Sequence, residues 1–109
     1  MMVRLTLILI LLSTGVQAQQ QGDTYSVNFI SLGAGIDSKA VDQLVAFHKR
    51  FEQDVKHKVP FTTRHWGREG EIDYRFDLKG LSPKQRKAFR DKIKKLFSGN
   101  QRVDLSGTL

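Results

Sequence analysis

Two kinds of hydrophobic pattern follow one another along the chain. Residues 25–32 (YSVNFISL) alternate between apolar and polar side chains, which predicts a strand. Over residues 39–57 the apolar side chains recur at three- and four-residue steps, which predicts an amphipathic helix. Asp37 or Ser38 can cap this helix, because a short side-chain oxygen accepts hydrogen bonds from first-turn amides. The apolar positions of the helix are Ala40, Leu44, Phe47, Phe51 and Val55.

The middle of the chain has the pattern of a β-hairpin. Residues 61–66 (FTTRHW) are β-branched and aromatic, which favours a strand. Residues 67–70 supply a turn with two glycines, and residues 71–78 then alternate strictly. The apolar side of this second strand carries Ile72, Tyr74, Phe76 and Leu78, and its charged side carries Glu71, Asp73, Arg75 and Asp77.

A second helix has three agreeing signals at its start. Ser82 is an expected N-cap, Pro83 occupies the first helical position and Gln85 can close a capping box. Gly99 can end the helix, and residues 102–105 (RVDL) are an expected last strand. The apolar stripe of the helix is Phe89, Ile93, Leu96 and Phe97.

The element order β-α-β-β-α-β predicts an α+β, ferredoxin-like sandwich, in which two helices cover one face of a four-stranded antiparallel sheet. Right-handed crossovers place the first and third strands in the centre. We expect one domain over residues 24–106, preceded by a flexible leader at 19–23 and followed by a tail at 107–109. The expected interior joins Ile72, Tyr74 and Phe76 to Leu44, Phe51, Phe89 and Leu96.

The amino end has the pattern of an export signal. Arg4 is followed by an aliphatic run over residues 5–12, and Val16 and Ala18 are the branched and small residues at the positions that a signal peptidase reads. The run is shorter than the roughly 20 apolar residues of a membrane-spanning helix. The sequence therefore predicts that residues 1–18 are a cleavable signal peptide, and that the mature chain is secreted or periplasmic without a transmembrane segment.

The residue composition of the chain excludes several kinds of chemistry. The 109-residue chain has no cysteine, which excludes disulfides, thiolate metal sites and a thiol nucleophile. His48, His57 and His65 lack metal-ligand spacing, so we predict no metal site and no cofactor. The glycine loop after the first strand matches neither a dinucleotide fingerprint nor a P-loop, which favours a tight turn.

No motif of an activated catalytic group is present, so the sequence predicts a protein that is not an enzyme. An enzyme would need a pocket that gathers several ionisable side chains, because acid–base catalysis requires shifted pKa values and excluded water. The residues available for such a pocket are His65, Glu69, Glu71 and Asp73.

The sheet face without helices is the leading candidate for binding. We expect it to present aromatic and charged side chains, which often anchor protein partners. The alternative is a solvated face in which opposite charges pair across strands, each pair contributing roughly 0.2–1 kcal/mol. The expected binding residues are Arg64, Trp66, Glu71, Asp73 and Arg75.

The second helix is densely basic in a chain of net charge +7. Clustered cations attract anionic surfaces, so an anionic envelope component is a second expected partner, and a solvated helix face is the alternative. Nucleic acid is disfavoured by export and by the acidic side chains expected on the third strand. A homodimer through Ile30 and Leu32 is a further alternative. The basic candidates are Lys84, Arg86, Lys87, Arg90 and Lys94, with Lys92 and Lys95 beside them.

The segments 25–29 (YSVNF), 74–76 (YRF) and 81–83 (LSP), with a last strand near Val103, are similar in plan to propeptides and free inhibitors of subtilisin-like proteases. This resemblance implies an inhibitor in which residues 106–109 enter the protease cleft. The chain departs from that family in its longer first helix and in lacking a glycine-aromatic segment in its second half. The resemblance supplies the alternative function.

Overall fold

The computed structural model describes residues 23–107. The predicted signal peptide, residues 19–22 of the predicted leader and residues 108–109 of the predicted tail lie outside the described residues. The elements are β1 (Thr24–Phe29), α2 (Ser38–Val55), β2 (Phe61–His65), β3 (Ile72–Asp77), α3 (Pro83–Leu96) and β4 (Val103–Gly107).

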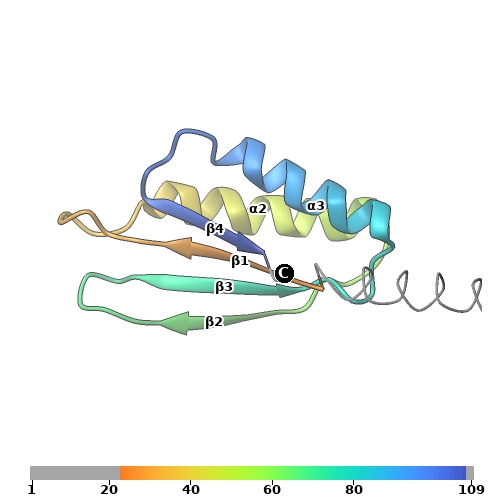
Figure 1. Ribbon diagram of the computed structural model, residues 1–109, viewed down its shortest axis with the longest axis horizontal. Helices are drawn as coiled ribbons and strands as arrows, with labels where there is room; N and C mark the ends of the chain where they lie inside the picture. The colour runs from red at the N-terminus through yellow and green to blue at the C-terminus, as the bar shows by residue number, and fades with distance from the viewer. Residues whose placement is uncertain (1–22, 108–109) are drawn as a thin grey trace, which may run out of the picture.

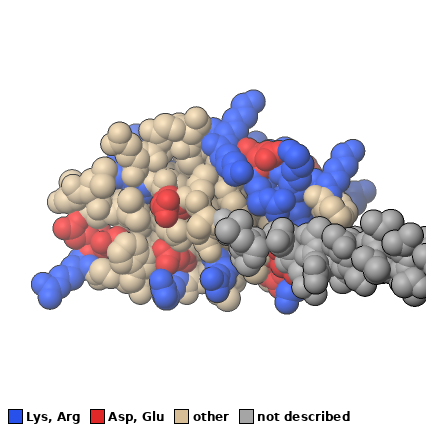
Figure 2. Space-filling view, in the orientation of Figure 1, with Lys and Arg blue, Asp and Glu red and all other residues tan. Residues whose placement is uncertain are grey.

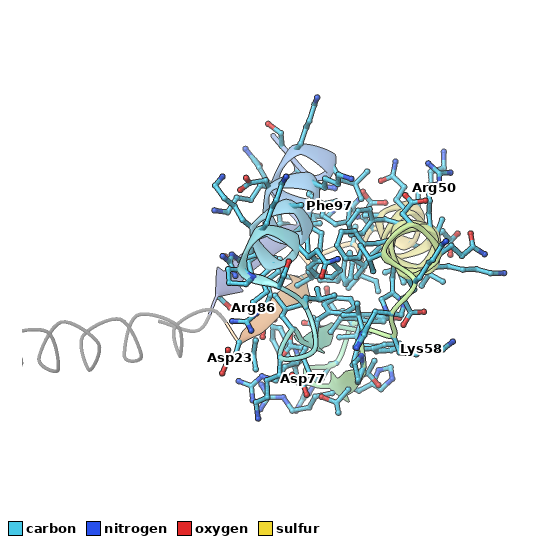
Figure 3. All side chains as sticks on the ribbon, turned by 90° about the vertical axis from the view of Figure 1, so that its right-hand side faces the viewer. Asp23, Arg50, Lys58, Asp77, Arg86 and Phe97 are labelled. Atoms are coloured by element: carbon cyan, nitrogen blue, oxygen red, sulfur yellow. The ribbon has the colours of Figure 1, made fainter. Side chains whose placement is uncertain are left out.

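The strands form one antiparallel sheet in the order β2-β3-β1-β4, with β1 and β3 in the centre (Figure 1). The view along the strands shows α2 and α3 on the same side of this sheet (Figure 3). The α+β, ferredoxin-like prediction is confirmed. Its consequence for function is that, among residues 23–107, both helices cover one face of the sheet and none covers the other.

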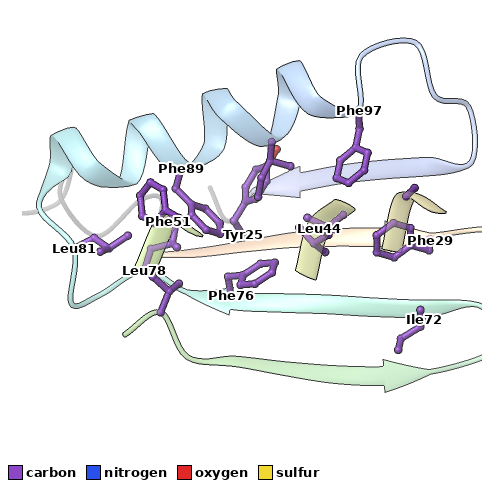
Figure 4. Close-up of a cluster of buried hydrophobic side chains, with 14 residues drawn as sticks. Tyr25, Phe29, Leu44, Phe51, Ile72, Phe76, Leu78, Leu81, Phe89 and Phe97 are labelled. Atoms are coloured by element: carbon purple, nitrogen blue, oxygen red, sulfur yellow. The ribbon is translucent and has the colours of Figure 1, made fainter. Parts of the chain in front are cut away.

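Alternation along the central strands separates core from surface. Tyr25, Val27 and Phe29 of β1 are at most 2% exposed, and they pair with Phe76, Tyr74 and Ile72 of β3. Leu44 and Phe51 of α2 and Phe89 of α3 close the core from above (Figure 4). Burying such side chains contributes roughly 1.5–3 kcal/mol each, so the apolar face of the sheet fixes the fold.

The predicted helix starts are confirmed. Asp37 caps α2, and its Oδ1 accepts from the Ala40 amide at 3.2 Å. Ser82 and Gln85 form the reciprocal capping box of α3, with Pro83 in its first turn.

The first strand ends earlier than predicted, at Phe29 instead of residue 32. Ser31 Oγ accepts hydrogen bonds from the amides of Gly33 and Gly35, both at 3.0 Å, and this bends the chain away from the sheet. Both glycines have positive φ angles, of 116° and 88°, which other residues rarely adopt. Leu32 therefore lies in a loop with 64% of its surface exposed, outside the sheet seam considered for a homodimer.

The end of α3 differs from the predicted stripe. Leu96 is 36% exposed and does not belong to the interior, whereas Phe97 is 5% exposed and packs edge-on against Phe29. Phe89, Ile93 and Phe97 follow four-residue steps, which rotate Leu96 to the flank of the helix.

Backbone pairing reaches both ends of the described chain. The last strand begins at Val103 and runs to Gly107, past the expected residues 102–105. Asp23, placed in the predicted leader, accepts from Leu78 N at 2.7 Å through its carbonyl oxygen. Both ends of the described chain are therefore hydrogen-bonded into the fold.

Candidate interaction surface

The helix-free face of the sheet, called here the open face, is built from the alternate residues of all four strands. Cross-strand pairing places Arg75 of β3 between Ser26 of β1 and Thr62 of β2. Two residues away, Asp73 lies between Asn28 and Arg64. The hairpin register therefore brings Arg64, Asp73 and Arg75 to one surface, as the alternation predicts.

Asp73 is the centre of a small polar cluster. Its two carboxylate oxygens accept separately, Oδ2 from Arg64 at 3.1 Å and Oδ1 from the Trp66 indole nitrogen at 2.8 Å. Arg64 is 78% exposed at its side chain and Asp73 only 20%, so the aspartate lies beneath its two donors. We call Arg64, Trp66 and Asp73 the Asp73 cluster. The cluster fixes the indole of Trp66, which is 40% exposed, on the open face.

Arg75 differs from Arg64 in having no hydrogen bond or ion pair with any residue of the described range 23–107. Its side chain is exposed in the middle of the sheet. A shallow hollow of about 200 Å³ surrounds it. The hollow is lined by Ser26, Thr62, Thr63, Arg64, Asp73 and Arg75. A guanidinium that has no partner in residues 23–107 and lies beside two hydroxyl groups can bind a carboxylate or phosphate through a bidentate pair of hydrogen bonds.

Glu71, the remaining predicted binding residue, belongs to the hairpin turn. Its Oε1 accepts from the Glu69 amide at 2.8 Å, while its backbone carbonyl accepts from Trp66 N at 3.0 Å. Glu69 in turn is hydrogen-bonded to Ser31 of the loop after β1. The structure therefore places Glu71 in the turn and outside the lining of the hollow.

The four ionisable residues considered for an enzyme are not gathered in one pocket. Asp73 lines the hollow on the open face. His65 pairs with Ile72 and so lies on the helix side of the sheet, while Glu69 and Glu71 belong to the turn. That the protein is not an enzyme stays a prediction.

The basic side chains of α3 fall into two groups. Lys84, Lys92, Lys94 and Lys95 are exposed, and Lys and Arg side chains gather over α3 in the space-filling view (Figure 2). Lys87 is also exposed and pairs with Asp91 at 2.6 Å. Arg90 is half-buried.

Arg86 does not share the exposure of these lysines. Its Nε donates to the carbonyl oxygens of Leu78 and Leu81 at 3.1 and 3.0 Å, and its Nη1 lies 3.3 Å from Asp23 (Figure 3). Arg86 therefore ties the loop before α3 to the start of β1. Sequence reasoning missed this role, because the accepting carbonyls carry no residue-type signal.

Two structural observations concern metals and membranes. Within residues 23–107, no three His, Cys, Asp or Glu side chains come together as metal ligands. No helix among the same residues is long and apolar enough to cross a bilayer. His48 instead packs at the helix–sheet boundary, where its Nε2 lies 2.8 Å from the Val59 carbonyl oxygen.

Burial in the core and the cap of α2 shift the pKa values of Tyr25 and Asp37, respectively. Burial raises the pKa of Tyr25, whose hydroxyl is buried without a hydrogen-bond partner among the described residues. The pKa of Asp37 is lowered, first by the hydrogen bond from the Ala40 amide and then by that from Asn100.

The fold and surface together define a class, a two-layer α+β domain with an open sheet face. No protein-family model matches the chain, and no curated protein is significantly similar to it.

Proposed function

We propose that this protein is an exported, non-enzymatic binding module that recognises an acidic segment of a partner protein on its open face. The observation that carries the proposal is Arg75, an exposed guanidinium without a partner in residues 23–107, placed between Ser26 and Thr62. A carboxylate seated there would accept from the guanidinium fork and from the adjacent hydroxyls.

The Asp73 cluster supports this assignment, because it removes the nearest competitor for Arg75. Both oxygens of Asp73 already accept hydrogen bonds, from Arg64 and from Trp66. The positive charge of Arg75 therefore remains available to an incoming anion. Trp66 adds an exposed aromatic surface beside it, and Trp and Arg are the residues most enriched at binding hot spots.

The sheet also limits the entropic cost of binding. Arg75 lies in β3, which is hydrogen-bonded to β1 on one side and β2 on the other. Its backbone is thus fixed before a partner arrives, and binding has only side chains to order. The exposed lysines of α3 would add long-range attraction for an acidic partner and raise the rate of encounter.

The proposal is tested with the mature chain and an acetylated hexaglutamate peptide. Trp66 is the single tryptophan of the chain, so its fluorescence reports on the open face. We expect a saturable change for the wild type and at least about tenfold weaker binding for Arg75→Gln, equivalent to about 1.4 kcal/mol. Lys84→Gln removes the same charge from α3 and is expected to change affinity less than about twofold.

Equal weakening by the two substitutions would contradict the proposal, because it would show general attraction to a basic protein. A matched capture experiment uses the envelope fraction of the producing cell. Trp66→Ala and Arg75→Glu are expected to abolish capture of a specific partner, while Lys84→Glu retains it. Unchanged capture of every partner by the first two variants would equally overturn the assignment to the open face.

A further inference from the structure

Among residues 23–107, β2 is an edge strand, and no other strand pairs with its outer side. The bonds Asp77 N to Pro60 O, at 2.8 Å, and Trp66 N to Glu71 O, at 3.0 Å, set the phase of the β2–β3 ladder. In this antiparallel phase the even-numbered residues of β2 direct their backbone groups toward β3. The amides and carbonyls of Phe61, Thr63 and His65 therefore point away from the sheet. All residues of β2 are exposed.

The opposite edge, β4, is more protected. Its first outward amide, that of Val103, already donates to the Asn100 carbonyl at 3.3 Å. Val103 and Leu105 are half-buried against the core, unlike any residue of β2. An uncovered edge strand is a template for pairing with another strand, so β2 is the edge at which a partner can add.

Apolar surface gathers at this same edge. Three of the five large exposed apolar side chains in the described residues are Val45, Phe61 and Trp66, with 51%, 45% and 40% of their surface exposed. Phe61 lies on the helix side of β2, where it stacks against Tyr74 and joins Val45 in lining a small apolar hollow. Trp66 lies on the open side, immediately after β2. A strand added at this edge would cover apolar side chains on both faces.

We propose that the occupant is a second copy of this chain, paired antiparallel through β2 about a two-fold axis at Thr63. In this register Thr63 faces its own counterpart, Phe61 faces His65 of the second copy, and Pro60 faces its Trp66. The three outward residues of each strand meet as hydrogen-bonded pairs. Pro60 falls at a non-hydrogen-bonded position, where its missing amide proton is not needed.

The charge distribution favours the β2 edge over the β4 edge for pairing with a second copy. The full chain has a net charge of +7, so two copies repel unless their basic surfaces are kept apart. Helix α2 lies over the β2 side of the sheet, where His48 packs 5.1 Å from Phe61 between ring centroids. Helix α3 lies toward β1 and β4 (Figure 3). Pairing through β2 therefore places the basic α3 helices of the two copies at opposite ends of the dimer.

Within β2 itself, the one Lys, Arg, Asp or Glu side chain is Arg64, which is paired with Asp73 at 3.1 Å. The proposed register places Arg64 opposite Thr62, so no like charges face each other directly. The product is a continuous eight-stranded sheet built from two four-stranded ones, with both open faces on the same side. The inference does not depend on what the open face binds.

Cross-linking tests the register, because the chain has no cysteine of its own. Facing residues of a hydrogen-bonded antiparallel pair have Cα atoms about 5.5 Å apart, within the roughly 4.4–6.8 Å range of disulfides. Thr63→Cys is therefore expected to form a disulfide-linked dimer under mild oxidation. Ser106→Cys, exposed on the other edge strand, is the control and is expected to remain monomeric. Equal cross-linking of both variants, or none of either, contradicts the register.

Sedimentation equilibrium of the mature chain tests the dimer without a new bond. Thr63→Lys places two ammonium groups opposite each other at the axis and is expected to raise the dimer dissociation constant about fivefold, equivalent to about 1 kcal/mol. Ser106→Lys adds the same charge elsewhere and is expected to change it less than about threefold. Thermal unfolding checks that both variants fold, and Arg75→Gln is expected to leave the dimer intact. A wild-type chain that stays monomeric up to about 1 mM overturns the proposal and leaves the edge to a strand of another protein.

Discussion

The two faces of β3 differ in polarity and in contact with solvent. One face points into the core and carries Ile72, Tyr74 and Phe76. Phe76 is 1% exposed and packs against the rings of Phe61 and Phe89. Asp73 and Arg75, one residue away, face solvent in a shallow hollow. The comparison shows that the fold depends on one set of residues and the proposed binding on the other, so substitutions should separate stability from recognition.

The largest expected effect separates these faces directly. Phe76→Ala should lower the free energy of unfolding by about 3–5 kcal/mol, because it leaves a cavity among packed aromatic rings. Arg75→Ala should change it by less than about 0.5 kcal/mol. Urea denaturation of both variants measures the difference. Similar losses for the two would show that the open face is part of the stabilising structure.

The same kind of comparison applies within α3. Arg86→Ala should lower the free energy of unfolding by roughly 1.5–3 kcal/mol, because it leaves the Leu78 and Leu81 carbonyls without their charged donor. Lys94→Ala, on the exposed side of the same helix, should cost less than about 0.5 kcal/mol. Equal effects, measured by urea denaturation, would contradict the distinction between a structural arginine and solvated lysines.

Tyr25 brings a polar hydroxyl group into the otherwise apolar core, where its side chain points toward α3 (Figure 4). Its hydroxyl is buried without a partner among the described residues, so Tyr25→Phe should raise the free energy of unfolding by about 1 kcal/mol. Burial raises the pKa of Tyr25 above its ordinary value of 10.0. The stability that the neutral phenol contributes is therefore full below that value and is lost as the pH rises through the folded-state pKa.

Thermal unfolding between about pH 9 and 11 measures this prediction. The advantage of Tyr25→Phe should widen toward the alkaline end, since the phenylalanine cannot ionise. A variant less stable than the wild type would show that the hydroxyl makes a favourable interaction.

The smallest expected effect concerns the cap of α2. The hydrogen bond from the Ala40 amide is the main cause of the lowered pKa of Asp37. Its contribution to stability is therefore present above the ordinary value of 3.8 and is lost as the pH falls through the folded-state pKa. Asp37→Ala should lower the melting temperature at pH 7 more than at about pH 2. A loss independent of pH would contradict the assignment of the cap to the ionised carboxylate.

The fold could be predicted because its signals are local. The alternation in β3, the helical spacing in α2 and the capping box of Ser82 and Gln85 each specify a neighbouring stretch of chain. The errors arose where a distant or subtle contact decides the geometry. Ser31 ends β1 through hydrogen bonds to a loop, and the helical phase of α3 turns Leu96 outward.

The candidate site was predictable in part. Alternation placed Asp73 and Arg75 on the open face, but only the hairpin register shows that Asp73 binds both Arg64 and Trp66. That register leaves Arg75 without a partner in the described residues, which residue types alone do not reveal. For the same reason Ser26 and Thr62, ordinary strand residues in the sequence, were not among the predicted binding residues.

Backbone amide NMR of the mature chain, titrated with hexaglutamate, tests most directly whether the helix-free face is the binding surface. We expect the largest shifts to cluster on Ser26, Thr62 and Arg75 and to include the indole of Trp66. The same shifts are expected to disappear in Arg75→Gln. Shifts that instead follow the lysines of α3, with the open face unchanged, would contradict the assignment of binding to the open face.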